Sequence, residues 1–317
     1  MADPTSGYAF PGVSNLHNDI YPSINPSITE SLHQPGKVVL ITGAGRGIGR
    51  ATALQYAHAR VSCIILCART SEQLDEVSHA IRNINSEIKV IKSSIDVSNE
   101  VAVKKLAKEV SESIGRLDIL VNNAGAAEPW VPISDSKPAE WWNTFEVNLK
   151  GPYLFLNAFL PLLVSTAAKE KTTVDVVNMA SIGAHVVRAS ASAYQTTKLA
   201  LCRLTEFVHV EYGDQGVNAI AVNPGGVPTQ LATGIEVIRP CTSHAATHVE
   251  RLSTLNILNL VLNDTPELSG GFLVWLTASA RTWLGGRYVA APWDVDVLEK
   301  MKDEIVSGDK LKVKLVI

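Results

Sequence analysis

From Lys37 onward, short apolar runs alternate with longer helical patterns along most of the chain. This alternation predicts βαβ units, because parallel neighbouring strands need a crossover connection that is usually a helix. The early runs are apolar throughout rather than at every second position, as expected when helices cover both faces of a sheet. We therefore predict an α/β fold, a three-layer doubly wound parallel sheet of about seven strands with helices on both faces.

The bounds of each element follow from where the patterns begin and end. The predicted strands are Val38–Thr42, Cys63–Cys67, Lys89–Ile95, Ile119–Val121, Val174–Met179, Asn218–Val222 and a last strand near Arg287–Ala290. The predicted helices are Gly47–Ala59, Ser71–Asn83, Asn99–Ile114, Trp142–Leu163, Ala191–Tyr212 and Pro266–Ala278.

A glycine-rich segment joins the first strand to the first helix, and its glycines are Gly43, Gly47 and Gly49. Glycine suits such a joint because the chain must turn sharply and the backbone must approach a pyrophosphate lying on the helix N-terminus. Glycines at a strand–helix turn also serve packing alone. The flanking strand and helix favour a dinucleotide site, and hence a sheet of the Rossmann type.

The end of the second predicted strand bears on the choice between NAD and NADP. Dinucleotide folds that bind NAD place a carboxylate there, on the ribose 2′-hydroxyl. This chain has Ala68 followed by Arg69, and Arg46 lies in the glycine loop. A guanidinium holds a 2′-phosphate with charge-assisted hydrogen bonds, whereas a carboxylate would repel it. Although both arginines are also consistent with solvated surface residues, the pair favours NADP(H).

Three segments define the expected domain organisation. Residues 1–35 lack periodicity and predict an N-terminal extension, either flexible or draped over the rest. Residues 36–317 are predicted to form a single Rossmann-type catalytic domain. Within it, Pro228–Thr265 shows no clear strand and predicts a substrate lid at about 228–265, over the carboxyl end of the sheet where ligands bind. A C-terminal extension is expected after about residue 292.

Tyr194 and Lys198 lie four residues apart in a predicted helix and so share one face. An ammonium beside a tyrosine favours the phenolate, so we expect Lys198 to lower the pKa of Tyr194 and suit it to proton transfer. The spacing alone is common on helix surfaces. Ser181, in Asn178-Met-Ala-Ser-Ile-Gly183, precedes the tyrosine by 13 residues and follows a predicted strand.

Three further motifs occur in a fixed order along the chain: Asn122-Asn-Ala-Gly125, Val147-Asn-Leu-Lys-Gly151 and Pro224-Gly-Gly-Val-Pro-Thr229. Together with the glycine loop and the Ser181–Tyr194–Lys198 set, they resemble the short-chain dehydrogenase/reductase family over roughly Gly36 to Val289. The N-terminal extension and the ending Trp293-Asp-Val-Asp-Val-Leu298 are similar to those of fungal members, many of which serve specialised (secondary) metabolism.

The resemblance implies an oxidoreductase that interconverts a carbonyl and an alcohol by hydride transfer with NADP(H). Tyr194 would be the general acid in reduction and the base in oxidation, and Lys198 would hold the nicotinamide ribose. Ser181 would donate a hydrogen bond to the substrate oxygen, and Asn148 would hold a water in a proton relay. The local alternatives are that Ser181 is a strand-end turn residue and that Asn148 satisfies a helix kink.

Cofactor contacts are carried over from the family position by position. They are Gly43, Arg46, Ile48 and Gly49 at the pyrophosphate, Asp96 and Val97 at the adenine, Asn123, Ala124 and Gly125 at the adenosine ribose, and Pro224, Gly225, Val227 and Thr229 at the nicotinamide carboxamide. From its local sequence, Asp96 is equally consistent with a turn former or a helix cap.

Two other classes of function remain open on this sequence. One is a cofactor-assisted isomerase, dehydratase or cyclase on the same fold, and the other is a non-enzymatic NADP-sensing protein. The complete set of Asn148, Ser181, Tyr194 and Lys198 argues against a sensor, because a sensor needs the glycine loop but no proton relay.

Charge and cysteine content limit partners and compartment. The 28 basic and 31 acidic residues give a net charge of -3, which provides no electrostatic reason to bind nucleic acid or an anionic membrane. No secretory signal and no Cys-x-x-Cys pair occur, so we expect a cytoplasmic protein. His244 and His248 have helical metal-ligand spacing but no third ligand, so no metal site is expected.

The expected assembly follows from a departure from the family pattern. Many members end in a short Asp-Gly-Gly segment at a subunit interface, whereas this chain has Ala290-Ala-Pro-Trp-Asp294 and continues to Ile317. The usual tetramer is therefore in doubt. A homodimer is expected through the helices that carry Asn157 and Tyr194, which match those of the family's dimer interface.

Overall fold

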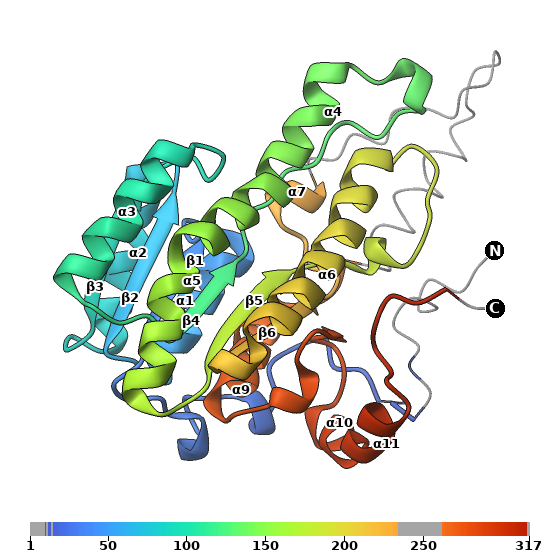
Figure 1. The fold of residues 1–317 in the computed structure, drawn as a ribbon. Helices are drawn as coiled ribbons and strands as arrows, with labels where there is room; N and C mark the ends of the chain where they lie inside the picture. The colour runs from blue at the N-terminus through green and yellow to red at the C-terminus, as the bar shows by residue number, and fades with distance from the viewer. Residues whose placement is uncertain (1–9, 11, 14, 234–261, 316–317) are drawn as a thin grey trace.

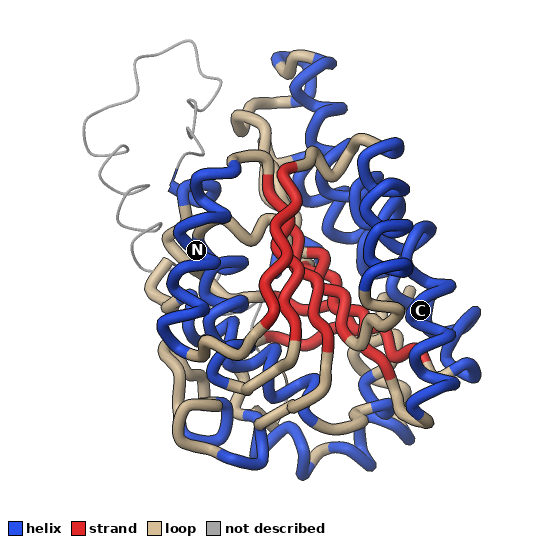
Figure 2. The backbone as a smooth tube through the Cα atoms, turned by 90° about the vertical axis from the view of Figure 1, so that its left-hand side faces the viewer, coloured by secondary structure: helices blue, strands red, loops and turns tan. Residues whose placement is uncertain are grey.

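A seven-stranded parallel sheet runs through the centre of the computed structural model, which describes residues 10, 12–13, 15–233 and 262–315. The strand order is β3-β2-β1-β4-β5-β6-β7, and every neighbouring pair is parallel. Helices lie on both faces of the sheet (Figures 1 and 2). The predicted fold class is therefore confirmed.

The strands agree with the predicted ones to within a residue at nearly every end. They are β1 Val38–Thr42, β2 Cys63–Ala68, β3 Lys89–Ser94, β4 Ile119–Asn122, β5 Val174–Met179, β6 Val217–Asn223 and β7 Tyr288–Ala290. The α-helices of the described residues are α1 Gly47–His58, α2 Ser71–Ile84, α3 Glu100–Ser113, α4 Pro138–Phe145, α5 Gly151–Glu170, α6 Ser192–Tyr212, α7 Gln230–Thr233, α9 Pro266–Ala278, α10 Val295–Lys300 and α11 Lys302–Ser307.

Successive residues of each central strand point into two different cores. In β1, Val39 and Ile41 pack with α1, α2 and α9, whereas Val38 and Leu40 pack with α3, α5 and α6. Because side chains alternate across a strand, a sheet covered on both faces needs apolar residues at every position. This arrangement accounts for the uninterrupted apolar runs in the sequence.

The predicted helix Trp142–Leu163 is longer in the structure. A continuous helical run extends over Pro138–Glu170, with a π-helical turn at Glu146–Lys150 between α4 and α5. By length and composition this run resembles a membrane span, but 61% of its most apolar window is buried inside the protein. The core helices of globular proteins show the same features, and the buried side of α5 packs against the sheet.

The described part of the N-terminal extension lies against the domain. His17 Nε2 lies 2.8 Å from Asp294 Oδ2, and Leu16 pairs with Trp293 in an isolated antiparallel bridge. The hydroxyl of Tyr21 accepts a hydrogen bond from the backbone N–H of Val295 at 2.8 Å. The sequence left open whether the N-terminal extension is flexible or draped over the domain. Its described residues are draped over the domain and pack on the C-terminal extension.

Candidate active site

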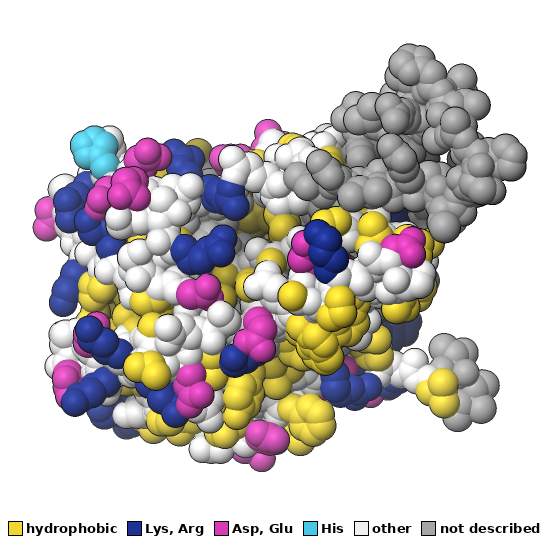
Figure 3. Space-filling view, turned by 90° about the horizontal axis from the view of Figure 1, so that it is seen from above, with side chains coloured by type: hydrophobic (Ala, Val, Ile, Leu, Met, Phe, Trp, Pro, Cys, Tyr) yellow, Lys and Arg dark blue, Asp and Glu magenta, His cyan; other side chains and the backbone are white. Residues whose placement is uncertain are grey.

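A cleft of about 750 Å³ opens at the carboxyl end of the strands, where parallel sheets bind ligands. It is lined by the glycine loop, the segments after β2 and β3, the Asn123–Ala126 segment after β4, and the residues around Thr229. Figure 3 views this side of the molecule from above, with charged side chains of both signs scattered over it and apolar side chains in patches between them.

The glycine loop has the close backbone packing that a bound dinucleotide requires. A Cβ on Gly49 would lie 2.2 Å from the carbonyl oxygen of Gly43, so no larger residue fits without a backbone shift. Asn123 Nδ2 donates to the carbonyl oxygens of Thr42 and Gly43, at 2.9 and 3.3 Å, and so ties the loop to the end of β4. The cleft therefore fits the adenosine-diphosphate part of a nicotinamide dinucleotide.

Arg46 and Arg69 line this cleft, as the sequence predicts, and both side chains are exposed. Within the described residues neither forms an ion pair. Gln73 and Glu76 of α2 line the same part of the cleft. The guanidinium groups are thus available to an anion, although two carboxylates, Glu76 and Asp96, line the same cleft and Asp96 interacts with the charge of Arg69.

Other predicted cofactor residues divide into those that line the cleft and those that do not. The lining set contains Gly43, Gly47, Ile48, Gly49, Asp96, Val97, Asn123, Ala124, Gly125 and Thr229. Pro224, Gly225 and Val227 lie outside it.

Asp96 also forms a turn. Its Oδ1 accepts hydrogen bonds from the backbone N–H of Ser98 at 2.9 Å and from the Ser98 hydroxyl at 2.7 Å. These bonds hold the pKa of Asp96 below its usual value. Both interpretations of Asp96 are therefore compatible with the structure.

Ser181, Tyr194 and Lys198 lie together beyond the end of this cleft. Ser181 follows β5 and caps a short 3-10 turn, its Oγ accepting from the N–H of Gly183 at 3.0 Å. The Ser181 hydroxyl lies close enough to the phenol of Tyr194 to favour its ionised form. Lys198 Nζ lies 5.5 Å from the centre of the Tyr194 ring and donates to the carbonyl oxygen of Met179 at 2.7 Å.

The expected lowering of the Tyr194 pKa is not found. Burial raises the pKa of Tyr194 above its ordinary value, the hydrogen bond from Ser181 opposes this rise, and the carboxylate of Glu128 adds to it. Burial also lowers the pKa of Lys198 to about 8, because an ammonium loses its hydration there. A pKa of about 8 leaves Lys198 mostly charged near neutral pH. Even so, desolvation of the phenolate is the largest contribution to the pKa of Tyr194 in this structure.

Asn148 occupies the π-helical turn between α4 and α5 and is buried. Its Oδ1 accepts from the N–H of Ala126 at 2.7 Å, and its Nδ2 donates to the carbonyl oxygen of Ala126 at 2.9 Å and to Thr197 Oγ1 at 3.2 Å. These contacts join the loop after β4 to α6. They agree with the kink interpretation of Asn148, while its role in a proton relay stays a prediction.

Two carboxylates that the sequence did not single out hold the site together. Glu128 accepts hydrogen bonds from the start of α6, and Asp264 Oδ2 accepts from the N–H of Gly226 at 2.6 Å. A Cβ on Gly225, whose φ is +96°, would lie 2.4 Å from the same Asp264 oxygen. No local motif marks either residue, since each partner lies far away along the chain.

Other sequence hypotheses resolve as packing or lie outside the described residues. The His185 ring packs edge-on against Tyr288, with centroids 4.3 Å apart. Trp141 stacks on Phe145, and its Nε1 donates to Ser192 Oγ at 3.0 Å. Residues 234–261, including most of the predicted lid and the His244–His248 pair, lie outside the described residues. In the part of the chain that is described, no cluster of His, Cys, Asp and Glu is arranged to hold a metal ion.

Comparison with known proteins identifies the family. The model for short chain dehydrogenases matches residues 37–237. The chain belongs to the short-chain dehydrogenase family. This short-chain dehydrogenase is 45% identical over its whole length to all of the short chain dehydrogenase mpl6 of Monascus purpureus. It is 39% identical to the short chain dehydrogenase pigC of Monascus ruber, over 96% of this chain and 93% of that one.

Among solved structures, levodione reductase is 26% identical and superposes with a TM-score of 0.69, covering 80% of this chain and 95% of that chain. The resemblance inferred from five motifs, including the likeness to fungal members, is thus confirmed. This short-chain dehydrogenase therefore has the fold of a family of oxidoreductases.

Proposed function

We propose that this protein is an NADP(H)-dependent oxidoreductase that interconverts a carbonyl and an alcohol, with Tyr194 as general acid and base. The observation that carries the proposal is the meeting of Tyr194, Ser181 and Lys198 at the carboxyl edge of the sheet, beside a cleft that fits a dinucleotide. All three side chains come from segments that follow or flank β5.

The chemistry follows from these side chains. When bound, the nicotinamide supplies or accepts the hydride. Tyr194 would give its phenolic proton to the carbonyl oxygen in reduction, and a phenol carries that proton at neutral pH even at its ordinary pKa of about 10. Ser181 would donate a hydrogen bond to the same oxygen and stabilise the charge that develops there. Lys198 would hold the ribose hydroxyls and, with Asn148, return a proton from solvent.

For the cofactor, the two exposed guanidinium groups of Arg46 and Arg69 support NADP(H). A double variant Arg46→Ala, Arg69→Ala should weaken NADPH binding by at least tenfold and leave NADH binding nearly unchanged, because only NADPH carries the 2′-phosphate. Fluorescence titration with both cofactors measures the two dissociation constants. Exposed Arg82→Ala, further along α2, is the matched control. A preference of the native protein for NADH would overturn this choice.

The reaction class is tested at Tyr194. Tyr194→Phe should lower NADPH-dependent carbonyl reduction at least about hundredfold, because it removes the proton donor. NADPH should still bind within a few fold. Tyr212→Phe, at the other end of α6, should keep full activity. Full activity in Tyr194→Phe would refute the proposal. A native protein that converts its substrate without net NADPH consumption would be an isomerase, dehydratase or cyclase instead.

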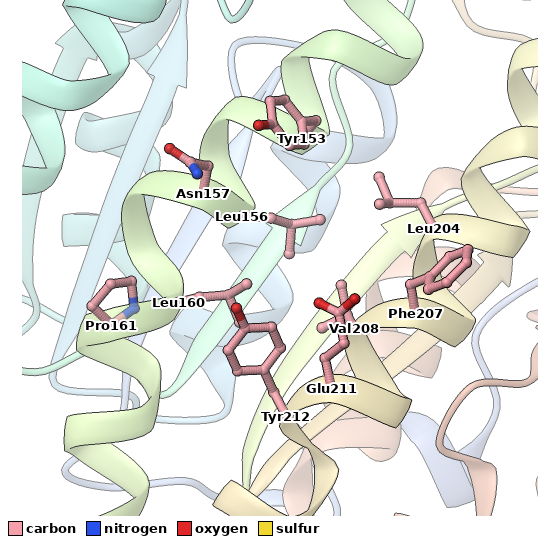
Figure 4. A pocket seen from close by; sticks show the side chains of 10 residues that line it. All are labelled: Tyr153, Leu156, Asn157, Leu160, Pro161, Leu204, Phe207, Val208, Glu211 and Tyr212. Carbon is pink, nitrogen blue, oxygen red and sulfur yellow. The ribbon is translucent and has the colours of Figure 1, made fainter.

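We also propose that the protein is a homodimer whose interface is the α5–α6 face. A groove of about 340 Å³ lies between these helices and is lined mainly by apolar side chains, with Asn157 and Glu211 at its polar positions (Figure 4). Tyr153 and Phe207 on this face are 52% and 56% exposed, an unusual amount for large side chains that face water. A second copy would cover them, as expected from the family's helix pairing.

Sedimentation velocity tests the assembly. Phe207→Glu should shift the protein from dimer to monomer, because it buries a charge in the interface, whereas Val101→Glu on α3 should not. A native monomer would contradict the proposal, and a native tetramer would require a second interface.

The similarity to fungal relatives supports a role in specialised metabolism. The cysteine content supports a cytoplasmic location.

A further inference from the structure

Helix α6, which carries Tyr194 and Lys198, has no capping side chain of its own. The residue at its N-cap is Ala191, which offers no acceptor to the backbone N–H groups of the first turn. Those groups need partners, since the first four N–H groups of a helix have none within the helix. The partner comes from another part of the chain: Glu128 Oε1 accepts from the N–H of Ala193 at 3.1 Å and of Tyr194 at 3.2 Å.

Glu128 is buried, and its second oxygen is also occupied. Oε2 accepts from Thr144 Oγ1 of α4 at 3.0 Å, so the carboxylate bridges two helices. Among the described residues no Lys, Arg or His forms an ion pair with it. A carboxylate buried without a cation is costly unless other dipoles replace its hydration, and the helix N-terminus supplies such a dipole. Glu128 is therefore held in place by α6, and it holds α6 in return.

A closed ring of hydrogen bonds connects this cap to Asn148. Asn148 binds the backbone of Ala126, two residues before Glu128, and it also donates to Thr197 Oγ1. Thr197 Oγ1 in turn donates to the carbonyl oxygen of Tyr194 at 2.7 Å. The backbone of Tyr194 is thus fixed from both sides, at its N–H by Glu128 and at its carbonyl by Thr197. The π-helical turn that places Asn148 in this ring is a feature common at functional sites.

The charge of Glu128 also acts on the phenol. Its carboxylate contributes to the raised pKa of Tyr194, because a nearby negative charge disfavours the phenolate. Glu128 thus opposes ionisation of Tyr194, an effect that shows itself at alkaline pH. The backbone contact and the charge are separable, because glutamine keeps an acceptor oxygen but carries no charge.

Building on the proposed function, we propose that Glu128 is a positioning residue for Tyr194. Its carboxylate caps the helix that carries the tyrosine and fixes the backbone of that tyrosine beside Ser181. It acts through Tyr194 and does not touch the reacting atoms.

The experiment compares Glu128→Ala, Glu128→Gln and a control, Thr144→Val, which removes the hydrogen bond to Oε2 but leaves the cap intact. NADPH-dependent reduction is measured as kcat and KM from pH 6 to the highest alkaline pH at which the native protein stays folded, with the NADPH dissociation constant and Tm for each variant. Glu128→Ala should lower kcat at least tenfold, with NADPH affinity within twofold of native. Glu128→Gln should recover most of that loss at neutral pH, because its amide oxygen still caps α6.

The pH profile separates positioning from simple support of the fold. In Glu128→Gln the alkaline fall of kcat/KM should move to lower pH, because the phenolate is no longer disfavoured by a neighbouring charge. Thr144→Val should keep the native profile. The other titratable groups on the elements packed around Tyr194 are unchanged in all three variants, namely Glu140, Glu146, Lys150, His185, Lys198 and Cys202.

Three outcomes would overturn the proposal. These are a native kcat in Glu128→Ala, a native pH profile in Glu128→Gln, or losses in Thr144→Val as large as those in Glu128→Ala. Should Glu128→Ala fail to fold, the profile of Glu128→Gln decides alone. Failure of the proposed function would look different, because the native protein would then show no Tyr194-dependent NADPH oxidation at all.

Discussion

The two edges of the sheet both carry buried polar groups, yet only the carboxyl edge has the features of a site. At the carboxyl edge, Gly49 and Asn123 lie beside a cleft. At the amino edge, Asp118 and Asp175 lie under closed packing next to Lys37, and the two acidic residues are only 1% and 2% exposed. Buried charge by itself therefore does not identify an active site. The carboxyl edge is identified instead by a cleft that is open to ligands and by the close backbone packing at Gly49.

The amino edge works as a structural network. Asp118 Oδ2 accepts from the N–H of Val38 at 2.8 Å, and both its oxygens accept from Arg116, at 2.8 and 2.9 Å. Lys37 Nζ donates to the carbonyl oxygen of Thr277 at 2.5 Å. These bonds join β1 and β4 to the end of α9. The edge thus closes the base of the sheet while the opposite edge stays open to ligands.

Breaking the amino edge should give the largest loss of stability. Asp118→Ala leaves the N–H of Val38 without its acceptor and leaves the Arg116 guanidinium with Glu170 alone, and should reduce the free energy of unfolding by about 3 kcal/mol. Urea unfolding measures this change. The exposed Lys104→Ala, which removes a surface pair with Glu100, should cost less than about 1 kcal/mol. If Asp118→Ala instead weakened NADPH binding without loss of stability, the contrast between the edges would be wrong.

Breaking the carboxyl edge should affect binding more than stability. In Gly49→Ala the new methyl group would meet the Gly43 carbonyl, at a cost of about 1–3 kcal/mol in stability. NADPH affinity should fall at least tenfold, because the loop must move out of the cleft. The matched control is Gly213→Ala, whose φ of -59° any residue adopts. Equal NADPH affinity in Gly49→Ala and native protein would show that the loop does not hold the cofactor.

The smallest expected effect concerns pH at the amino edge. Burial raises the pKa of Asp175 to about 7, well above its unfolded value. The folded state therefore binds an extra proton between the two values, and stability falls as pH rises from about 4 through 7. Asp175→Asn has no such titration, so its stability relative to native protein should rise between pH 5 and pH 8. A difference that does not change with pH would contradict this.

The elements and the cofactor loop were predictable because their signals are local. Strand β1 and the glycine loop can be predicted from residues that are neighbours in the sequence. The order of the motifs then predicts Ser181, Tyr194 and Lys198 as site residues. What was missed depends on distant contacts. Glu128 meets the N–H of Tyr194 from 66 residues away, and the raised pKa of Tyr194 depends on how deeply the fold buries it. The extension of α5 to Glu170 likewise follows from burial of Thr166 and Ala167 against the core.

The contact between His17 and Asp294 has a consequence for the order in which the site is completed during synthesis. The two residues are 277 positions apart, and Thr265, which binds the carbonyl oxygen of Asn18 at 2.8 Å, is also made late. Because the ribosome releases the N-terminal part first, the glycine loop and Asn123 can assemble early. The Gly226 turn, which depends on Asp264, must wait for the last third of the chain. The ribosome therefore releases the glycine loop and Asn123 well before Asp264, which fixes the Gly226 turn.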